Sequence, residues 1–231
     1  MVRIAVLVLG VLFLSGCIAT KANVASDVPE AQPGKRILVM PLDVELSLLS
    51  ASGLREVNAE WTRQGIENVR AALSGALTMR NTEFYMPEME LEARPIEDSV
   101  TQLLKLHAAV GNAILLHQYQ SALALPSRSG SFDWTLGQEA TSLRDIHDAD
   151  YALFVHLRDS FTSGGRVAVM LLAGAVGVAV PGGQQVGFAS LVDLNTGRFL
   201  WFNILQSGTG DLREPENAEK VVAALLKGAP L

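Results

Sequence analysis

Few side chains of this 231-residue sequence have a type and spacing suited to chemistry. The four histidines, His107, His117, His147 and His156, are scattered, and no two have the spacing of a helix-face pair or a zinc finger. The segment His147–Asp150 offers a nitrogen and carboxylate oxygens to a metal ion, but we interpret it as the end of a helix that leads into a strand. No phosphate-binding loop or serine-nucleophile elbow is present. We therefore expect no catalytic residues, no bound metal and no cofactor.

An acidic segment is the other candidate for metal binding. Its carboxylates belong to Glu88, Glu90, Glu92, Glu97 and Asp98. They alternate with apolar residues and lack the glycine-containing spacing of a calcium loop. We interpret the segment as a solvated loop.

Cys17 is the only cysteine, so its thiol cannot form a disulfide within the chain. Residues 1–16 have the parts of a secretory signal, with Arg3 at the start, an apolar run over Ile4–Leu14 and small residues at the end. The apolar run is shorter than the roughly 20 residues of a membrane-spanning helix. The sequence therefore predicts a signal peptide over residues 1–16.

The residues Leu14, Ser15, Gly16 and Cys17 resemble the lipobox of bacterial lipoprotein precursors. The resemblance implies that a signal peptidase recognises the first three and that the Cys17 thiol becomes a diacylglyceryl thioether, with palmitate-type chains that anchor the protein in a membrane. Ile18, where retention in the inner membrane would place Asp, implies the periplasmic face of the outer membrane. An ordinary signal peptide or a short anchor with an incidental cysteine is the alternative.

Residues 17–35 join the predicted lipid to the rest of the chain. Polar residues and two prolines without helical or strand periodicity predict a flexible tether after Cys17. Such a tether would let a folded domain over residues 36–231 stand off the membrane.

The composition fits one globular domain that does not bind nucleic acid. Hydrophobic residues make up 49% of the chain and charged residues 18%. The formal net charge is −6 and no run of Lys or Arg occurs, whereas nucleic-acid binding depends on neutralising phosphates.

The apolar patterns over residues 36–231 predict alternating strands and helices. They indicate a buried strand at Arg36–Asp43, a helix from Gly53 to just before Asn81, a strand at Glu83–Pro87, helices at Ser99–Leu125 and Leu136–Asp148, a half-buried strand at Asp150–Phe161, a strand pair over Gln185–Leu205 that turns at Asp193–Gly197, and a helix at Pro215–Lys227. This order predicts an α/β fold, a single layered domain with a mixed sheet packed by helices.

Two of these segments resemble a known family. Ile37, Leu38, Val39, Pro41 and Leu42 match its first strand, and Leu191, Asp193, Thr196, Gly197 and Trp201 match its last hairpin. The family is that of bacterial envelope lipoproteins similar to the curli-secretion channel (CsgG-like), with related uncharacterised groups. The resemblance implies a small α/β domain that binds envelope proteins or assembles into rings, without catalysis.

The resemblance leaves three functions to distinguish. The first is a non-catalytic interaction or assembly module in a cell-envelope complex. The second is an oligomeric component of an envelope secretion or transport channel, and the third is a hydrolase of envelope polymers. The second requires a homo-oligomer, which separates it from the first.

The segment Val167–Val180 consists of fourteen uncharged apolar residues. As a helix it would be about 21 Å long, too short for a hydrocarbon core of about 30 Å. It is either a buried core helix or strand pair, or an exposed element that touches another subunit or a membrane. Its candidate interface residues are Val167, Met170, Leu171, Leu172, Val176 and Val178.

Overall fold

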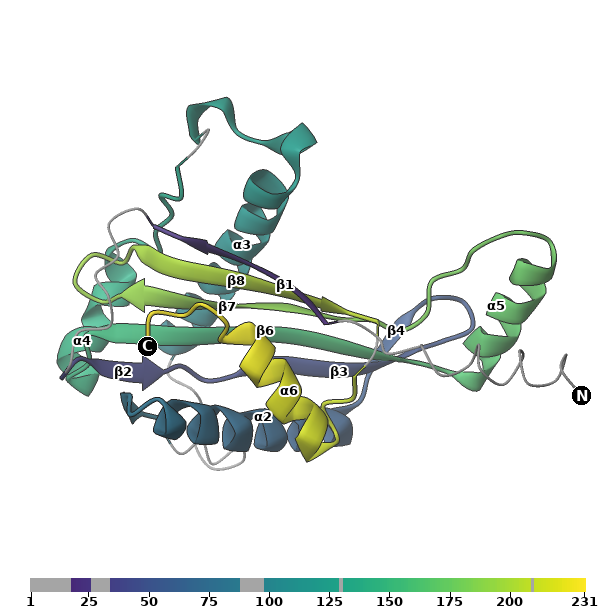
Figure 1. Cartoon of the computed structure of the whole chain (residues 1–231), viewed down its shortest axis with the longest axis horizontal. Coiled ribbons are helices and arrows are strands. Elements are labelled where there is room, and N and C mark those ends of the chain that lie inside the picture. The colour runs from purple at the N-terminus through teal and green to yellow at the C-terminus, as the bar shows by residue number, and fades with distance from the viewer. Residues whose placement is uncertain (1–17, 26–33, 88–97, 129–130, 209) are drawn as a thin grey trace, which may run out of the picture.

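The computed structural model describes residues 18–25, 34–87, 98–128, 131–208 and 210–231. Within these ranges, eight strands form one sheet and five α-helices accompany it (Figure 1). The strands are β1 (Ala19–Val24), β2 (Arg36–Val39), β3 (Asp43–Leu49), β4 (Arg55–Val57), β5 (Glu83–Tyr85), β6 (Tyr151–Thr162), β7 (Gln185–Asp193) and β8 (Phe199–Ser207). The helices are α2 (Ala59–Met79), α3 (Asp98–Tyr119), α4 (Ser142–His147), α5 (Gly164–Ala175) and α6 (Pro215–Leu225). The predicted α/β class with a mixed sheet is confirmed.

The long strand β6 organises the sheet. The strand order is β1-β8-β7-β6-β2-β5, and β3 continues beside β6 where β2 ends, with β4 on its outer side. The strands β2 and β3 run parallel to β6, whereas β7 and β8 form an antiparallel meander with it. Because Pro41 lies between β2 and β3, it requires no ladder hydrogen bond from its nitrogen.

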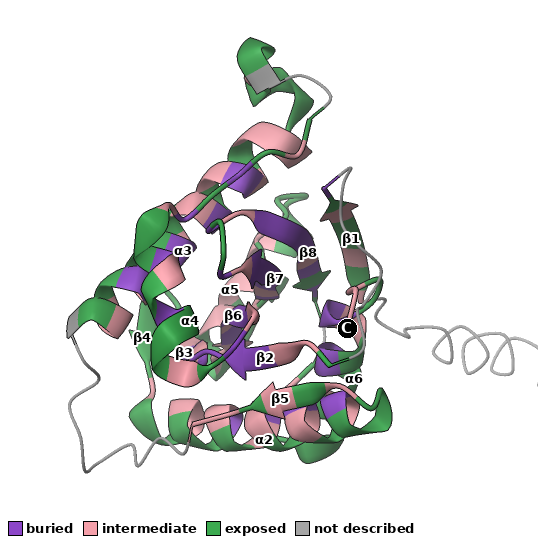
Figure 2. Ribbon diagram, turned by 90° about the vertical axis from the view of Figure 1, so that its left-hand side faces the viewer, coloured by how far each residue is buried: buried purple, intermediate pink, exposed green. Residues whose placement is uncertain are grey.

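Helices cover both faces of the sheet. Figures 1 and 2 show α2 and α6 on one face and α3 with α4 on the other, while α5 extends beyond one end of the sheet. The outer surfaces of α2 and α3 are mainly exposed, and their buried residues face the strands (Figure 2). The domain therefore has three layers, with α5 outside them.

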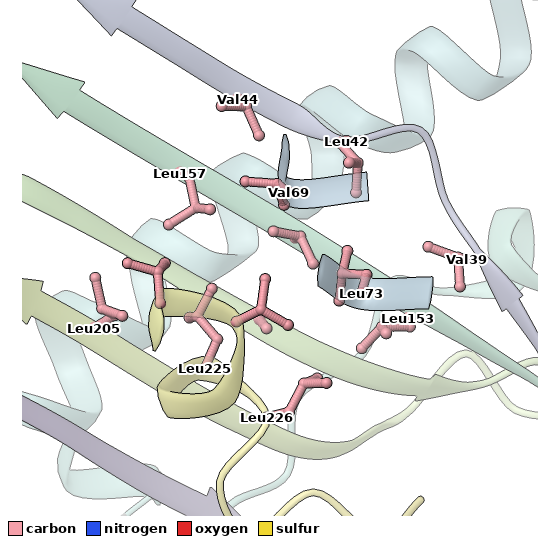
Figure 3. Close-up of a cluster of buried hydrophobic side chains, with 14 of the residues drawn as sticks. Val39, Leu42, Val44, Val69, Leu73, Leu153, Leu157, Leu205, Leu225 and Leu226 are labelled. Carbon is pink, nitrogen blue, oxygen red and sulfur yellow. The ribbon is translucent and has the colours of Figure 1, made fainter. Parts of the chain in front are cut away.

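The face beneath α2 and α6 is packed with aliphatic side chains (Figure 3). Val69 and Leu73 of α2 and Leu225 of α6 converge on Leu153 and Leu157 of β6. Helix α2 presents its buried residues at helical spacing, and Asn58 caps its first turn by accepting a hydrogen bond from the Trp61 amide at 3.0 Å.

The opposite face is built around aromatic rings. Phe154, Phe188, Phe199 and Phe202 pack there against α3, and Gly111 of α3 has no room for a Cβ because the Phe188 ring would lie 2.3 Å from it. The strand β6 contributes alternate residues to both faces, so Ala152 to Leu157 are all buried. The prediction that this strand is half-buried was therefore wrong, because helices cover both sides of it.

The start of α2 also differs from the prediction. The sequence predicted a helix from Gly53, but residues 43–57 form the β3–β4 hairpin, with Leu49 opposite Arg55, and the helix begins at Ala59. Leu54 and Val57, which the predicted helix included, are 68% and 60% exposed. Their spacing matches a helix by coincidence, because Asn58 and the hairpin hydrogen bonds stop the helix before it reaches them.

The predicted tether contains a strand. Residues Ala19 to Val24 form β1, which pairs antiparallel with β8 from Gln206 to Trp201. The Tyr119 hydroxyl of α3 also donates to the Lys21 carbonyl at 3.0 Å. The prediction of a free tether over residues 17–35 was therefore wrong for residues 19–24, which belong to the sheet.

The other predicted elements are present. The β7–β8 hairpin turns at Asp193–Gly197, where Gly197 has a φ of +72° and Asp193 accepts a hydrogen bond from the Asn195 amide. Trp201, on the strand after this turn, is fully buried. The acidic segment from Glu88 to Glu97 lies outside the described residues.

Candidate functional site

The exposed helix α5 is the main candidate for a functional site. It connects β6 to β7, and Ser163 caps it by accepting a hydrogen bond from the Arg166 amide at 3.1 Å. From Val167 to Val180, ten residues are exposed, four are intermediate and none is buried. The described structure therefore excludes the core interpretation of this segment and leaves the interface and membrane interpretations.

Most of the predicted interface residues are strongly exposed. Relative exposure is 44% for Val167, 70% for Leu171, 73% for Leu172, 76% for Val176 and 54% for Val178. Met170 is intermediate, and a Cβ on Gly182 would lie 3.4 Å from its Cε, so it covers the chain that returns to β7. From Val167 to its last residue, Ala175, the helix has no polar side chain and therefore no polar face. A helix that is apolar all round normally lies in an apolar environment.

Hydrogen bonds at the base tie the segment to the sheet. The Arg166 side chain donates to the Pro181 carbonyl from Nε at 3.2 Å and Nη2 at 2.9 Å. The Gly183 amide donates to Thr162 Oγ1 at 2.7 Å, and Ser163 donates through its amide to the Leu49 carbonyl at 3.1 Å. The exposed helix thus extends from a fixed base.

The turn after α5 pairs three of its backbone amides internally. The amides of Val176 and Val178 donate to the Ala173 carbonyl, and the Gly177 amide donates to the Gly174 carbonyl. Gly177 has a φ of +79°, which allows this turn. A turn with paired amides can enter an apolar environment at lower cost than one with free amides.

The loop between β3 and β4 adds an apolar side chain beside the base of α5. A Cβ on Gly165 would lie 3.2 Å from Ala51 Cβ, and one on Gly53 would lie 3.3 Å from an Arg166 guanidinium nitrogen. Leu54 is exposed on this loop. We call the set of exposed side chains Leu54, Val167, Leu171, Leu172, Val176 and Val178 the apolar end. The contribution of Leu54 was missed because the sequence pattern placed it in a helix.

The first described strand begins at the same end of the sheet. Ala19 pairs with Gln206 of β8, Ser207 pairs with Gln185 of β7, and Gln185 pairs with Asp159 of β6, whose strand ends at Thr162 just before α5. The predicted lipid attachment residue Cys17 and its recognition residues Leu14, Ser15 and Gly16 lie outside the described residues. Two residue steps separate Cys17 from Ala19, which is about 7 Å at full extension.

A buried carboxyl group lies near this end of the sheet. Asp159 is 2% exposed and accepts hydrogen bonds from the Leu212 amide at 3.1 Å and the Gln185 side chain at 3.0 Å. Burial raises the pKa of Asp159 to about 6, although both hydrogen bonds favour its charged form. The group connects β6, β7 and the segment that leads to α6.

Two of the four histidines, His107 and His156, occupy buried structural positions. His156 Nδ1 lies 2.7 Å from Asp43 Oδ2, and Arg158 Nη2 lies 2.7 Å from Asp43 Oδ1. Burial alone would raise the pKa of Asp43, but the hydrogen bonds and charges of His156 and Arg158 hold it below its ordinary value. His107 Nε2 lies 2.8 Å from the Ser190 hydroxyl, and burial lowers the pKa of His107 to about 3. Because Ser190 is fully buried, this pair has no route to a substrate.

The remaining candidates for metal binding are dispersed. The segment His147–Asp150 ends α4 and leads into β6, as predicted, and Asp150 pairs with Lys35 at 2.7 Å. Among the residues that the structure describes, no three His, Cys, Asp or Glu side chains gather closely enough to hold a metal ion. In the same ranges, no helix is both long enough and apolar enough to cross a membrane.

The arrangement defines a three-layer α/β domain that carries an exposed apolar helix at one end of its sheet. No protein-family model and no curated protein matches the chain. A solved structure of a PelC dodecamer from Paraburkholderia phytofirmans is similar over 92% of this chain and 98% of that chain, with 9% identity and a TM-score of 0.43. A variant of that dodecamer from the same organism is similar over 93% of this chain and 98% of the variant's chain, with 10% identity and a TM-score of 0.40. At such low similarity, no functional conclusion follows from either match.

Proposed function

We propose that this chain is an envelope lipoprotein of the outer membrane whose periplasmic α/β domain works by binding rather than by catalysis. In this proposal residues 1–16 are removed as a signal peptide, Cys17 carries the acyl chains, and residues 36–231 together with β1 form an interaction or assembly module. The observation that carries the proposal is the apolar end, because a fixed and exposed apolar helix is typical of a site that binds another protein or a membrane surface.

The position of β1 changes how such a lipoprotein would sit on its membrane. A free tether would separate the domain from the lipid, whereas β1 is paired with β8 from Ala19 onward. Acyl chains on Cys17 would therefore hold one end of the sheet within about 7 Å of the anchored residue. The domain would work against the membrane surface.

Lipid attachment is tested by labelling with palmitate in growing cells. We expect the wild-type protein to incorporate the label and Cys17→Ser to incorporate none, because the thioether requires the thiol. Ser15→Ala is the matched control, since it alters the same segment but keeps both a small residue and the cysteine. Labelling of Cys17→Ser, or the absence of label on the wild type, would contradict the proposal.

An oligomeric component of an envelope secretion or transport channel is the second candidate. It is favoured by the two unlike edges of the sheet, since within the described ranges β1 ends one side and β4 and β5 end the other without a further strand. Unlike edges that meet head to tail can close a ring of identical subunits. The native mass of the lipidated protein in mild detergent, measured by light scattering after gel filtration, separates a ring from a monomer.

A further inference from the structure

We propose that α5 and the turn after it are immersed in the leaflet that holds the acyl chains of Cys17, so that the membrane itself covers the apolar end. This inference rests on the proposed lipid attachment and adds a second, proteinaceous contact with the same bilayer. The two contacts would fix the orientation of the domain, with the sheet end at Thr162 toward the lipid and the end at Tyr151 away from it.

The shared position of β1 and α5 selects the membrane as the occupant. The pairing of Ala19 with Gln206 places the start of the described chain at the sheet end from which α5 projects. A lipid attached two residues earlier would bring the bilayer to that end and not to the opposite one. The apolar end would then meet hydrocarbon without any movement of the domain.

The chemistry of the segment also fits lipid better than a second protein surface. Residues Val167 to Val180 include no side chain that donates or accepts a conventional hydrogen bond. Specific protein interfaces contain about one hydrogen bond per 100–200 Å², and the side chains of this segment can form none. The segment also lacks acidic groups that would repel anionic headgroups.

The length of α5 fits one leaflet. Its 12 residues span about 18 Å, which approaches half of a hydrocarbon core and its headgroup layer. The internally bonded amides of Val176, Gly177 and Val178 allow the tip of the segment to leave water. The Arg166 guanidinium at the base lies near the start of the helix, where the headgroups would be.

The test measures contact with lipid at two single-cysteine positions. Because acylated Cys17 has no free thiol, Leu171→Cys on α5 and Ala223→Cys on the exposed side of α6 can each be labelled with an environment-sensitive fluorophore. The full-length lipidated protein is reconstituted into vesicles of phosphatidylethanolamine and phosphatidylglycerol that contain nitroxide-labelled phosphatidylcholine. We expect quenching by the nitroxide to be several-fold stronger at position 171 than at position 223.

Equal quenching at the two positions would overturn the proposal. A blue-shifted fluorophore at position 171 that the nitroxide does not quench, and whose shift grows with protein density, would also overturn it and would identify a second copy as the occupant. Labelling of the wild-type protein by the fluorophore would reveal a free Cys17 thiol. That result would contradict the lipid attachment but not the immersion of α5. In that event the same two variants in a Cys17→Ser background, added to preformed vesicles, give the same test of α5.

Discussion

The helices α5 and α6 are nearly equal in length but opposite in burial. The 11-residue α6 buries Ala218, Val221, Val222 and Leu225 against the sheet and α2, while the 12-residue α5 buries no residue. The helix α6 also has an outward polar side, and Asn203 of β8 donates to its last carbonyls, those of Ala224 and Leu225, at 3.0 and 2.7 Å. The less apolar helix is thus the one inside the domain.

The difference shows that a high content of apolar residues does not ensure that a helix is buried within its own domain. The amphipathic α6 has two sides that match the two environments of a domain surface, the core and the water. The helix α5 has no side that matches water, and within the described residues the domain supplies no surface that covers it. Its apolar side chains therefore require an environment outside the domain, which we propose is the bilayer.

Truncation of one leucine on each helix tests the difference in burial with the largest expected effect on stability. Leu225 is 1% exposed and Leu172 is 73% exposed. We expect Leu225→Ala to lower the free energy of unfolding by about 3 kcal/mol, because it leaves a cavity in the aliphatic core. The matched variant Leu172→Ala should change it by less than about 0.5 kcal/mol.

Urea denaturation of both full-length variants in mild detergent measures these two values. A large loss of stability from Leu172→Ala would mean that α5 is packed against protein after all. A small loss from Leu225→Ala would mean that α6 is not held as the structure places it.

The pattern of burial explains which elements the sequence could predict. The helix α6 and the β7–β8 hairpin were predicted because their apolar periodicity or turn residues match their final environment. The strand β1 was missed because it is an edge strand in which only Thr20 and Asn23 are partly buried, so no alternating apolar pattern marks it. A strand whose pairing depends on an exposed edge leaves little trace in hydropathy.

The candidate site was predictable in part. The sequence located the apolar segment Val167–Val180 and its side chains, but apolarity predicts removal from water and not what replaces the water. The sheet register adds what hydropathy lacks, because it shows that Ala19 and the start of α5 share one end of the sheet, which supports the bilayer as the proposed environment. Leu54 lies at the apolar end only because residues 43–57 form the β3–β4 hairpin. The sequence did not predict this hairpin, because its apolar residues continue the helical spacing of the α2 segment.

The buried carboxyl of Asp159, on the strand that leads to α5, gives a pH-dependent prediction. The Asp159 carboxyl has a pKa of about 6 in the folded protein against an ordinary value of 3.8. The folded state therefore holds more protons between these values, so this group stabilises the fold at low pH and the stabilisation is lost as the pH rises to about 6. Replacement by Asn mimics the protonated form and keeps an oxygen to accept from the Leu212 amide.

We expect Asp159→Asn to be more stable than the wild type by roughly 2 kcal/mol near neutral pH, and the two proteins to converge near the ordinary pKa of the carboxyl. Urea denaturation of both across this pH range isolates the group, because all other titrating groups are shared. Parallel pH profiles for the two proteins would show that Asp159 does not titrate in this range.

The prediction with the smallest expected effect concerns Gly174, and it distinguishes lipid from a second protein as the neighbour of α5. Gly174 lies within the helix, and an added Cβ would meet no atom within 4 Å. We expect Gly174→Ala to raise the free energy of unfolding by about 0.5–1 kcal/mol through helix propensity, with the native mass unchanged. Gly177→Ala is the matched control, since it also adds one methyl group but at a φ of +79°, and it should destabilise the turn.

Thermal unfolding and light scattering in mild detergent measure both properties of the Gly174 variant. Hydrocarbon chains rearrange around one more methyl group, whereas a helix of a second copy packed closely on glycine cannot. A lower native mass or a lower stability for Gly174→Ala would therefore place another protein backbone against α5, and it would favour a homo-oligomer at this surface over the bilayer.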